Sequence, residues 1–197
     1  MKQEIFGLSL TELQIRLAEM GLKRFRAKQI FSWLYRKCVF DFSAMTNLSL
    51  AERDTLAEYF SILPGEIICL RQLDSADGLT QKLLLQLLDG NTIETVLMHH
   101  DYGYSVCVSS QVGCDMHCAF CASGLNGAVR NLTQTEILAQ VYFFNARLAA
   151  AGQRVSRVVV MGSGEPMLNF DNVFGALQFL HLPETANMSY RNMTVST

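Results

Sequence analysis

Cys114-Asp115-Met116-His117-Cys118-Ala119-Phe120-Cys121 is the stretch from which the fold and chemistry of this chain can be inferred. Its three cysteines follow the spacing C-x3-C-x2-C, and three thiolates in one short loop suit an iron-sulfur cube with one iron left open. Zinc is the alternative, but a structural zinc site usually needs four ligands in two pairs. No second C-x2-C pair exists, so the fourth ligand would have to be His117, which adjoins Cys118, or the distant His99 or His100.

The segments around this stretch alternate between strand and helix. The longest expected helix begins at a capping box of Thr133 and Glu136, in which a hydroxyl and a carboxylate satisfy unpaired amides. Alternating strands and helices predict a parallel sheet with right-handed crossovers, hence an α/β fold. The expected strands are 104–109, 157–161 and 192–197, and the expected helices are 132–151 and 172–180.

The first hundred residues have a different pattern. Helices are expected after two further capping boxes, Ser9-Leu10-Thr11-Glu12 and Ser49-Leu50-Ala51-Glu52, and from Ala27 to Lys37. Two strand-like runs, 81–88 and 92–98, then flank Asp89-Gly90-Asn91, which predicts a β-hairpin. We therefore expect a helical accessory domain over 1–62, a hairpin linker region over 63–101, and the first β/α units of a partial barrel over 102–197.

Composition limits where the chain works. Half of the 197 residues are hydrophobic, which is enough for a sizeable core. No apolar run approaches the roughly 20 residues that span a bilayer, and no secretory leader opens the sequence, so a cytoplasmic protein is expected. The chain stops directly after an apolar β run, which would leave an open sheet edge. It is therefore expected to be an incomplete catalytic unit.

The net charge of −2 conceals an asymmetry, because residues 1–40 alone carry a charge of +5. A basic stretch with interleaved aromatic residues suits a phosphate backbone, since neutralising phosphates releases counterions. A solvated helix face is the alternative on charge alone. The residues in question are Lys23, Arg24, Phe25, Arg26 and Lys28, followed by Trp33 and Tyr35.

With Phe120 before the third cysteine and a strand ahead of the loop, the cysteine stretch resembles the radical S-adenosylmethionine (SAM) superfamily. In that superfamily three cysteines hold a 4Fe-4S cluster, and the open iron binds the amino and carboxylate groups of SAM. The resemblance therefore implies that Cys114, Cys118 and Cys121 are the cluster ligands.

The next strand supports this resemblance, because it leads into Gly162-Ser163-Gly164-Glu165-Pro166. In these enzymes a Gly-Glu-Pro element holds the SAM amino group. The resemblance thus implies that Gly164 and Glu165 bind SAM, together with Ser196 at the tip of the third strand.

A finer resemblance narrows the family to the rRNA adenine-C2 methyltransferases known as RlmN, from about residue 10 to the last residue. Ser163 departs from that family, which commonly has Met there; we expect altered packing near SAM with Gly164 and Glu165 kept in place. The stretches that carry the resemblance are Cys107-Val108-Ser109-Ser110-Gln111-Val112-Gly113-Cys114, Arg130-Asn131-Leu132, 161–169, Phe25-Arg26-Ala27-Lys28-Gln29-Ile30 with Trp33 and Tyr35, and Ile93-Glu94-Thr95-Val96.

The family resemblance also implies a mechanism. Its members methylate a cysteine near their C-terminus with one SAM and use a second SAM to activate that methyl group. Cys107 then corresponds to the cysteine whose disulfide frees the product, and Glu94 to a proposed proton acceptor. On the residues alone, Cys107 would be a small buried hydrophobe and Glu94 a solvent-facing strand residue. The methyl-accepting cysteine is expected beyond Thr197.

The implied partners are 23S rRNA, tRNA, and an electron donor such as flavodoxin or ferredoxin, with the protein acting as a monomer. Cys38 and Cys69 have no motif around them and are expected to be structural. Two alternatives stay open. One is the C8-methylating antibiotic-resistance relative, and the other is a nucleic-acid-binding module with a structural zinc.

Overall fold

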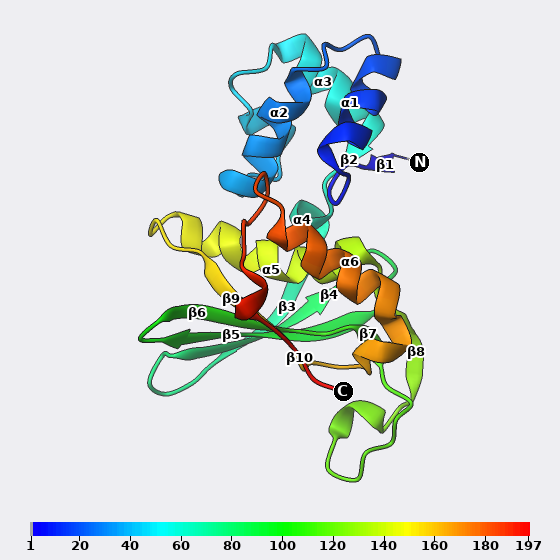
Figure 1. Cartoon of the computed structure of the whole chain (residues 1–197), viewed down its shortest axis with the longest axis vertical. Coiled ribbons are helices and arrows are strands. Elements are labelled where there is room, and N and C mark those ends of the chain that lie inside the picture. The colour runs from blue at the N-terminus through cyan, green and yellow to red at the C-terminus, as the bar shows by residue number, and fades with distance from the viewer. Residues whose placement is uncertain (1) are drawn as a thin grey trace.

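A six-stranded sheet lies at the centre of the computed structural model, which describes residues 2–197 (Figure 1). The strand order is β10-β9-β6-β5-β4-β3. Strands β6, β9 and β10 are parallel, whereas β3, β4 and β5 run antiparallel to their neighbours. The expected α/β fold with parallel strands is confirmed. The strand bounds are β3 (Ile68–Asp74), β4 (Thr80–Gln86), β5 (Thr92–His100), β6 (Gly103–Val108), β9 (Val155–Val160) and β10 (Met193–Val195).

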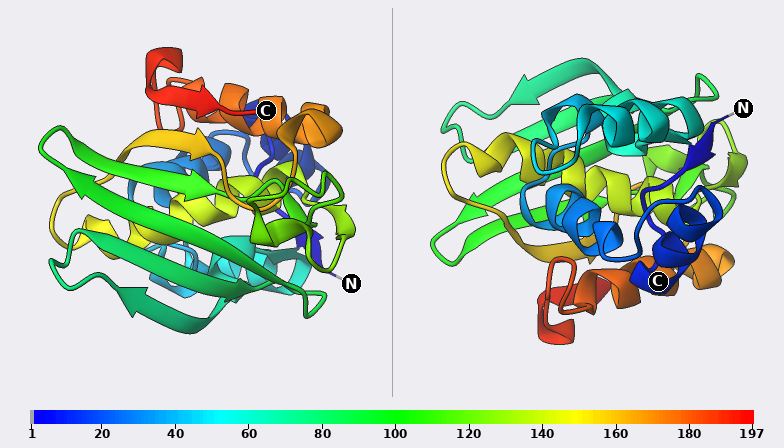
Figure 2. Two further views of the ribbon diagram at one scale, coloured as in Figure 1. Left: turned by 90° about the horizontal axis from the view of Figure 1, so that it is seen from below. Right: turned by 90° about the horizontal axis from the view of Figure 1, so that it is seen from above.

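Two helices, α5 (Gln134–Ala149) and α6 (Phe170–His181), cover one face of this sheet. Val106 and Val108 of β6 point into that layer and are fully buried. Because side chains alternate along a strand, Cys107 between them points to the other face. No helix of residues 2–197 lies over that other face, which Figure 2 (left) shows from below. We call it the uncovered face.

The predicted hairpin forms from β4 and β5. The amide of Leu87 donates to the carbonyl oxygen of Asn91 at 2.8 Å, and Gly90 adopts a φ of 83° in the turn. Strand β5 also pairs with β6, so the sheet is continuous across the proposed boundary at residue 102. Strand β3 was not predicted, because it is an edge strand whose Leu70 and Leu73 are half exposed, without a buried alternating face.

Short helices form the N-terminal part, and both predicted capping boxes are present there. Ser9 Oγ accepts from the amide of Glu12, whose carboxylate accepts from the Ser9 amide at 2.7 Å, and Ser49 and Glu52 repeat the arrangement. The helix expected up to Lys37 is α-helical only to Phe31 and continues as a short π-helix, η1. The elements are β1 (Gln3–Glu4), α1 (Leu10–Glu19), α2 (Arg26–Phe31), η1 (Ser32–Arg36), η2 (Phe42–Ala44), α3 (Leu50–Tyr59), β2 (Phe60–Ser61) and α4 (Leu63–Glu66).

An aromatic cluster fixes this helical part onto α5 and α6. The ring of Tyr35 lies 5.3 Å from that of Tyr142 and 5.1 Å from that of Phe179, and Phe6 lies 5.3 Å from Tyr142. The Tyr35 hydroxyl accepts from the amide of Gly7 at 2.8 Å. Such pairs contribute about 0.5–1.5 kcal/mol each beyond the area they bury, so the two parts form a packed junction.

None of the helices in residues 2–197 is both long and apolar enough to cross a lipid bilayer.

Candidate metal and cofactor site

The cysteine loop hangs from a small antiparallel hairpin, β7 (Gln111–Gly113) and β8 (Ala128–Asn131), that sequence patterns did not predict. Gly113 has a φ of 77°, and a Cβ added there would lie 2.0 Å from the carbonyl oxygen of Gly127. The amide of Cys114 donates to that same oxygen at 3.2 Å. Only glycine therefore lets the two ends of the loop approach so closely.

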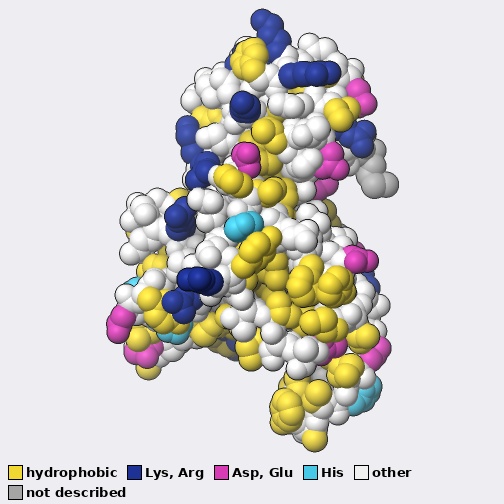
Figure 3. Space-filling view, viewed as in Figure 1, with side chains coloured by type: hydrophobic (Ala, Val, Ile, Leu, Met, Phe, Trp, Pro, Cys, Tyr) yellow, Lys and Arg dark blue, Asp and Glu magenta, His cyan; other side chains and the backbone are white. Residues whose placement is uncertain are grey.

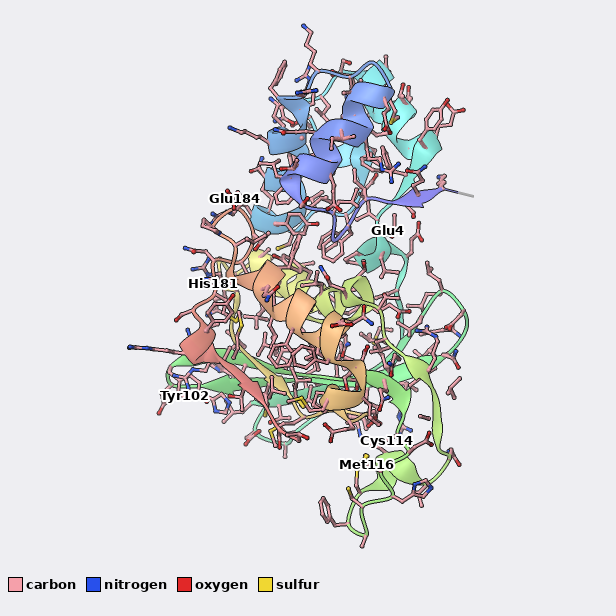
Figure 4. All side chains as sticks on the ribbon, turned by 45° about the vertical axis from the view of Figure 1, so that its right-hand side comes forward. Glu4, Tyr102, Cys114, Met116, His181 and Glu184 are labelled. Atoms are coloured by element: carbon pink, nitrogen blue, oxygen red, sulfur yellow. The ribbon has the colours of Figure 1, made fainter. Side chains whose placement is uncertain are left out.

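The three loop cysteines differ in exposure. Cys114 is buried, while Cys118 and Cys121 are exposed and joined by a turn in which the Cys121 amide donates to the Cys118 carbonyl oxygen at 3.0 Å. Figure 4 shows Cys114 at the base of the loop and Met116 nearby. Within residues 2–197 no three His, Cys, Asp or Glu side chains are grouped so as to hold a metal ion. The structure therefore does not bring the thiols together as a ready-made site, although three thiols on one loop are a suitable donor set for a cluster.

The other polar side chains of the loop are turned to its backbone. Asp115 Oδ1 accepts from the amide of Ala128 at 2.6 Å, and His117 Nδ1 lies 2.5 Å from the Asp115 carbonyl oxygen. Hydrogen bonds from the amide and hydroxyl of Ser123 lower the pKa of the Cys121 thiol, which favours the thiolate that binds metal.

The histidines that could complete a zinc site lie elsewhere. His99 and His100 pair with Tyr104 and Gly103 at the start of β6, whereas the cysteine loop follows the end of that strand. His99 stacks on Tyr104 at 4.4 Å. This separation weighs against the zinc interpretation.

The Gly-Ser-Gly-Glu-Pro loop follows β9 and lies directly beside β7. Gly164 has a φ of 105°, and a Cβ there would lie 2.6 Å from the Cβ of Gln111. Glu165 is half-buried and caps a short helix, η4 (Pro166–Asn169), by accepting from the amide of Met167 at 2.9 Å. The loop thus presents one carboxylate beside the cysteine hairpin.

Hydrogen bonds hold the two loops together. The amides of Ser110 and Gln111 donate to the Ser163 carbonyl oxygen at 2.8 and 3.1 Å, and Gln111 Oε1 accepts from the amide of Glu165 at 2.8 Å. The hydroxyls of Ser123 and Ser163 lie 3.2 Å apart, which connects the cysteine loop directly to the Glu165 loop.

Buried amide side chains support this arrangement, and sequence reasoning assigned them no role. Asn169 Nδ2 donates to the carbonyl oxygens of Ser110 and Leu132, both at 2.7 Å. Gln140 of α5 bonds both the amide and the carbonyl of Ser109. Asn169 lies within residues 161–169, which resemble the RlmN family, and this resemblance is the only sequence feature that points to it.

Glu94 and Cys107 share the uncovered face, and Ser196 follows the strand at its edge. Cys107 pairs with Val96 of β5, two residues after Glu94, and with Val159 of β9. Val159 in turn pairs with Thr194, two residues before Ser196. Since paired residues and residues two apart point to one side of a sheet, the Glu94 and Cys107 side chains belong to this face. Ser196 directly follows β10, and its amide donates to the Val160 carbonyl oxygen at 3.4 Å, at the end of β9.

The surroundings of Glu94 and Cys107 differ. Burial raises the pKa of the half-buried Cys107 thiol, which is therefore neutral near neutral pH, and all six cysteines are free in the structure. The Glu94 carboxylate is exposed and lies 2.7 Å from Lys82 Nζ. Lys82 was not identified from sequence; its pairing with Val96 puts it on the uncovered face.

The predicted RNA-binding residues fall into two groups. Lys23, Arg24, Phe25 and Lys28 are exposed, as that role requires. Tyr35 is buried in the aromatic cluster, which favours packing over base stacking for this ring, and Arg26 is paired with Glu52 at 2.7 Å. Trp33 donates to Asn47 and is partly buried.

Comparison with known proteins defines the class first. A crystal structure of a radical SAM methyltransferase from Sphaerobacter thermophilus superposes with a TM-score of 0.92 at 42% identity, covering 99% of this chain and 57% of that one. The fold is therefore that of a radical SAM methyltransferase.

Sequence comparison identifies similar proteins. Residues 3–62 match the ribosomal RNA large subunit methyltransferase N-terminal domain (RlmN_N). Proteins named probable dual-specificity RNA methyltransferase RlmN are 47% identical in Spiroplasma citri and in Staphylococcus aureus (strain bovine RF122 / ET3-1), covering 98% and 100% of this chain. The chain spans 55% and 53% of their lengths, about half. The chain is thus similar to RlmN proteins along its length, and the match of residues 3–62 to their N-terminal domain indicates that it corresponds to their N-terminal part.

Proposed function

We propose that this chain is part of an enzyme that methylates C2 of an adenine in 23S rRNA, and also in tRNA, through a methyl-cysteine intermediate. The observation that carries the proposal is the shared uncovered face. Side chains suited to proton transfer (Glu94) and thiol chemistry (Cys107) point to one side of the sheet. Ser196, suited to SAM binding, directly follows β10, and the two loops that follow β6 and β9 adjoin at the edge of the sheet.

The proposal assigns the cofactors to two loops. Cys114, Cys118 and Cys121 would hold a 4Fe-4S cluster, while Gly164, Glu165 and Ser196 would hold SAM. When bound, this pair supplies the one-electron chemistry that the reaction needs, because adenine C2 offers no lone pair to a sulfonium methyl donor. The hydrogen bonds between the loops support the assignment, since both groups must meet at one place.

The residues of the uncovered face would perform the remaining steps. Glu94 would accept the proton that leaves C2, held in position by Lys82. Cys107 would form the disulfide that frees the product, with the sulfur of the methyl-bearing cysteine, and burial raises its pKa, which keeps the thiol protonated beforehand. The proposal assigns the methyl-bearing cysteine to the half of the relatives' length that this chain does not cover.

The remaining parts of the proposal follow the family. The enzyme would act in the cytoplasm as a monomer, with a flavodoxin or ferredoxin as electron donor. Methylation at C8 is the alternative that shares the cluster, the SAM chemistry and the two cysteines. Mass mapping of the methyl group on rRNA from cells that express the full-length protein separates the two, and a C8 mark would refute the proposal.

The cluster assignment has its own test. Anaerobically reconstituted full-length enzyme should contain iron and acid-labile sulfide, whereas zinc without sulfide would refute it. Replacing any one of Cys114, Cys118 and Cys121 by Ala should abolish the brown chromophore, because a cube held by two thiolates is readily lost. Replacing Cys69, which lies outside the loop, by Ala is the matched control and should leave the chromophore intact.

A further inference from the structure

A cleft separates the N-terminal helices from the core on one side of the molecule. Its volume is about 340 Å³, and it is lined by Arg36 and Lys37 at the end of η1 and by Arg154 just before β9. Asn145 and Thr185 are among the uncharged lining residues. Among the described residues that line the cleft there is no Asp or Glu, so three cations face it without a neutralising carboxylate.

The three cations have no carboxylate partner elsewhere either. Within residues 2–197 none of them takes part in a salt bridge. The Arg36 guanidinium donates to the carbonyl oxygen of Pro183, and Lys37 Nζ lies 3.5 Å from the ring centre of Trp33. These contacts hold Arg36 and Lys37 in place and leave their charges, like that of Arg154, available to an anion.

The positive surface continues beyond the cleft in both directions. Figure 3 shows Lys and Arg side chains (dark blue) along the left side, from the N-terminal helices down to the sheet. Arg154 also lines a neighbouring hollow of about 200 Å³, together with Ser189 and Asn192. On the other side of Arg36 lies a hollow lined by Lys28, and there the carboxylate of Glu184 does occur.

We propose that this cleft binds neighbouring phosphates of an RNA backbone and guides the strand from the N-terminal helices to the core. The inference rests on the proposed function, which supplies RNA as the substrate. A groove with several fixed cations and no carboxylate attracts a polyanion and repels no phosphate. Its position at the junction lets one RNA strand contact both parts.

The positively charged surface leads from the cleft to the uncovered face of the sheet, as guiding an RNA strand there requires. Arg154 lies at the start of β9, and three residues later Arg157 stands 3.9 Å over the ring of Tyr102. Arg157 pairs with Ser105, two residues before Cys107, and so belongs to the uncovered face. In Figure 4, Glu184, His181 and Tyr102 follow this side from the helices to the sheet. An RNA strand along the surface therefore arrives at the face that carries Cys107.

The test is the salt dependence of RNA binding by the full-length enzyme. Lys37→Gln combined with Arg154→Ala should lower the slope of log affinity against log salt by about 1.4–1.8 for a transcribed 23S rRNA fragment, because each lost phosphate contact removes about 0.7–0.9. At about 0.1 M salt the affinity should fall about 25- to 60-fold. The Arg154 side chain makes no hydrogen bond within residues 2–197, so replacing it should leave the fold intact. The single variant Arg154→Glu should therefore also weaken RNA binding.

The matched control is Arg16→Ala combined with Arg71→Ala, which removes two exposed cations that do not line the cleft. If both double variants change the slope equally, the effect is general charge and the inference is refuted. An unchanged salt dependence of RNA binding in the cleft variants also refutes the inference about the cleft, even if the wild-type enzyme methylates adenine C2. A lower salt dependence in the cleft variants alone supports RNA binding in the cleft, even if the enzyme proves to methylate adenine C8.

Discussion

Replacing Glu165 by Gln tests the proposed SAM site with little change to the protein itself. Glu165 Oε1 accepts from the amide of Met167 at 2.9 Å and so caps η4. The amide oxygen of Gln can accept the same bond, while the glutamine keeps the length of the side chain. The substitution therefore removes the negative charge and leaves the loop geometry in place.

The expected effect follows from the type of hydrogen bond that is lost. A carboxylate bonded to the SAM ammonium contributes about 1.5–3 kcal/mol, whereas a neutral hydrogen bond contributes about 0.5–1.5 kcal/mol. The difference is about 1.4 kcal/mol, which corresponds to about a tenfold weaker Kd for SAM. Loss of the charged cap should reduce stability by less than about 1 kcal/mol, because the amide still caps the helix.

Calorimetric titration of SAM into the reconstituted full-length enzyme measures this effect, with iron content as a check on the cluster. Asp171→Asn is the matched control, because Asp171 is an exposed carboxylate in the first turn of α6, only a few residues away. It makes the same change of charge near the same loop and should leave the Kd for SAM unchanged. Equal affinities of wild type and Glu165→Gln would refute the assignment, as would an equal loss in both variants.

Two further predictions concern the stability of this chain. Burial raises the pKa of Glu4 to about 7, so the carboxyl is destabilising once it ionises, and its cost appears as pH rises from about 4.5 through about 7. Glu4→Gln should therefore raise the free energy of unfolding near pH 8 by up to about 3 kcal/mol and have little effect near pH 5. Urea denaturation at the two pH values measures this, and an equal increase in the free energy of unfolding at both would contradict the prediction. Gly164→Ala should lower the free energy of unfolding by about 2–4 kcal/mol, because alanine is strained at a φ of 105° and its Cβ would meet Gln111. A free energy of unfolding within about 0.5 kcal/mol of wild type would show instead that the loop adapts.

Local signals in the sequence predicted the elements of this fold well. The capping boxes at Ser9, Ser49 and Thr133 all form, because each depends only on residues three positions apart. The hairpin turn at Gly90 was predictable for the same reason. The alternation of strands and helices after residue 103 gave the parallel sheet, since each strand is apolar enough to lie under a helix layer.

Features that depend on distant contacts were not predictable. The burial of Tyr35 results from its packing on Tyr142 and Phe179, more than a hundred residues later, so the local sequence left packing and base stacking equally open for its ring. Strands β7 and β8 are short and carry mixed side chains, and they pair only because the cysteine loop folds back. Likewise, Lys82 and Glu94 became neighbours only through the register of β4 with β5.

Ser163 was expected to alter packing near SAM while leaving Gly164 and Glu165 in place, and its contacts show how the loop is held. The main chain of Ser163 carries the connection, because its carbonyl oxygen accepts from Ser110 and Gln111 and its amide donates to Ser109 Oγ at 3.0 Å. None of these bonds depends on the side chain, so a methionine could make them equally well. The serine hydroxyl lies 3.2 Å from that of Ser123, whose own hydrogen bonds reach the Cys121 sulfur. A serine at this position is thus compatible with the observed position of Gly164 and Glu165, and its hydroxyl connects the proposed SAM loop, through Ser123, to a proposed cluster ligand.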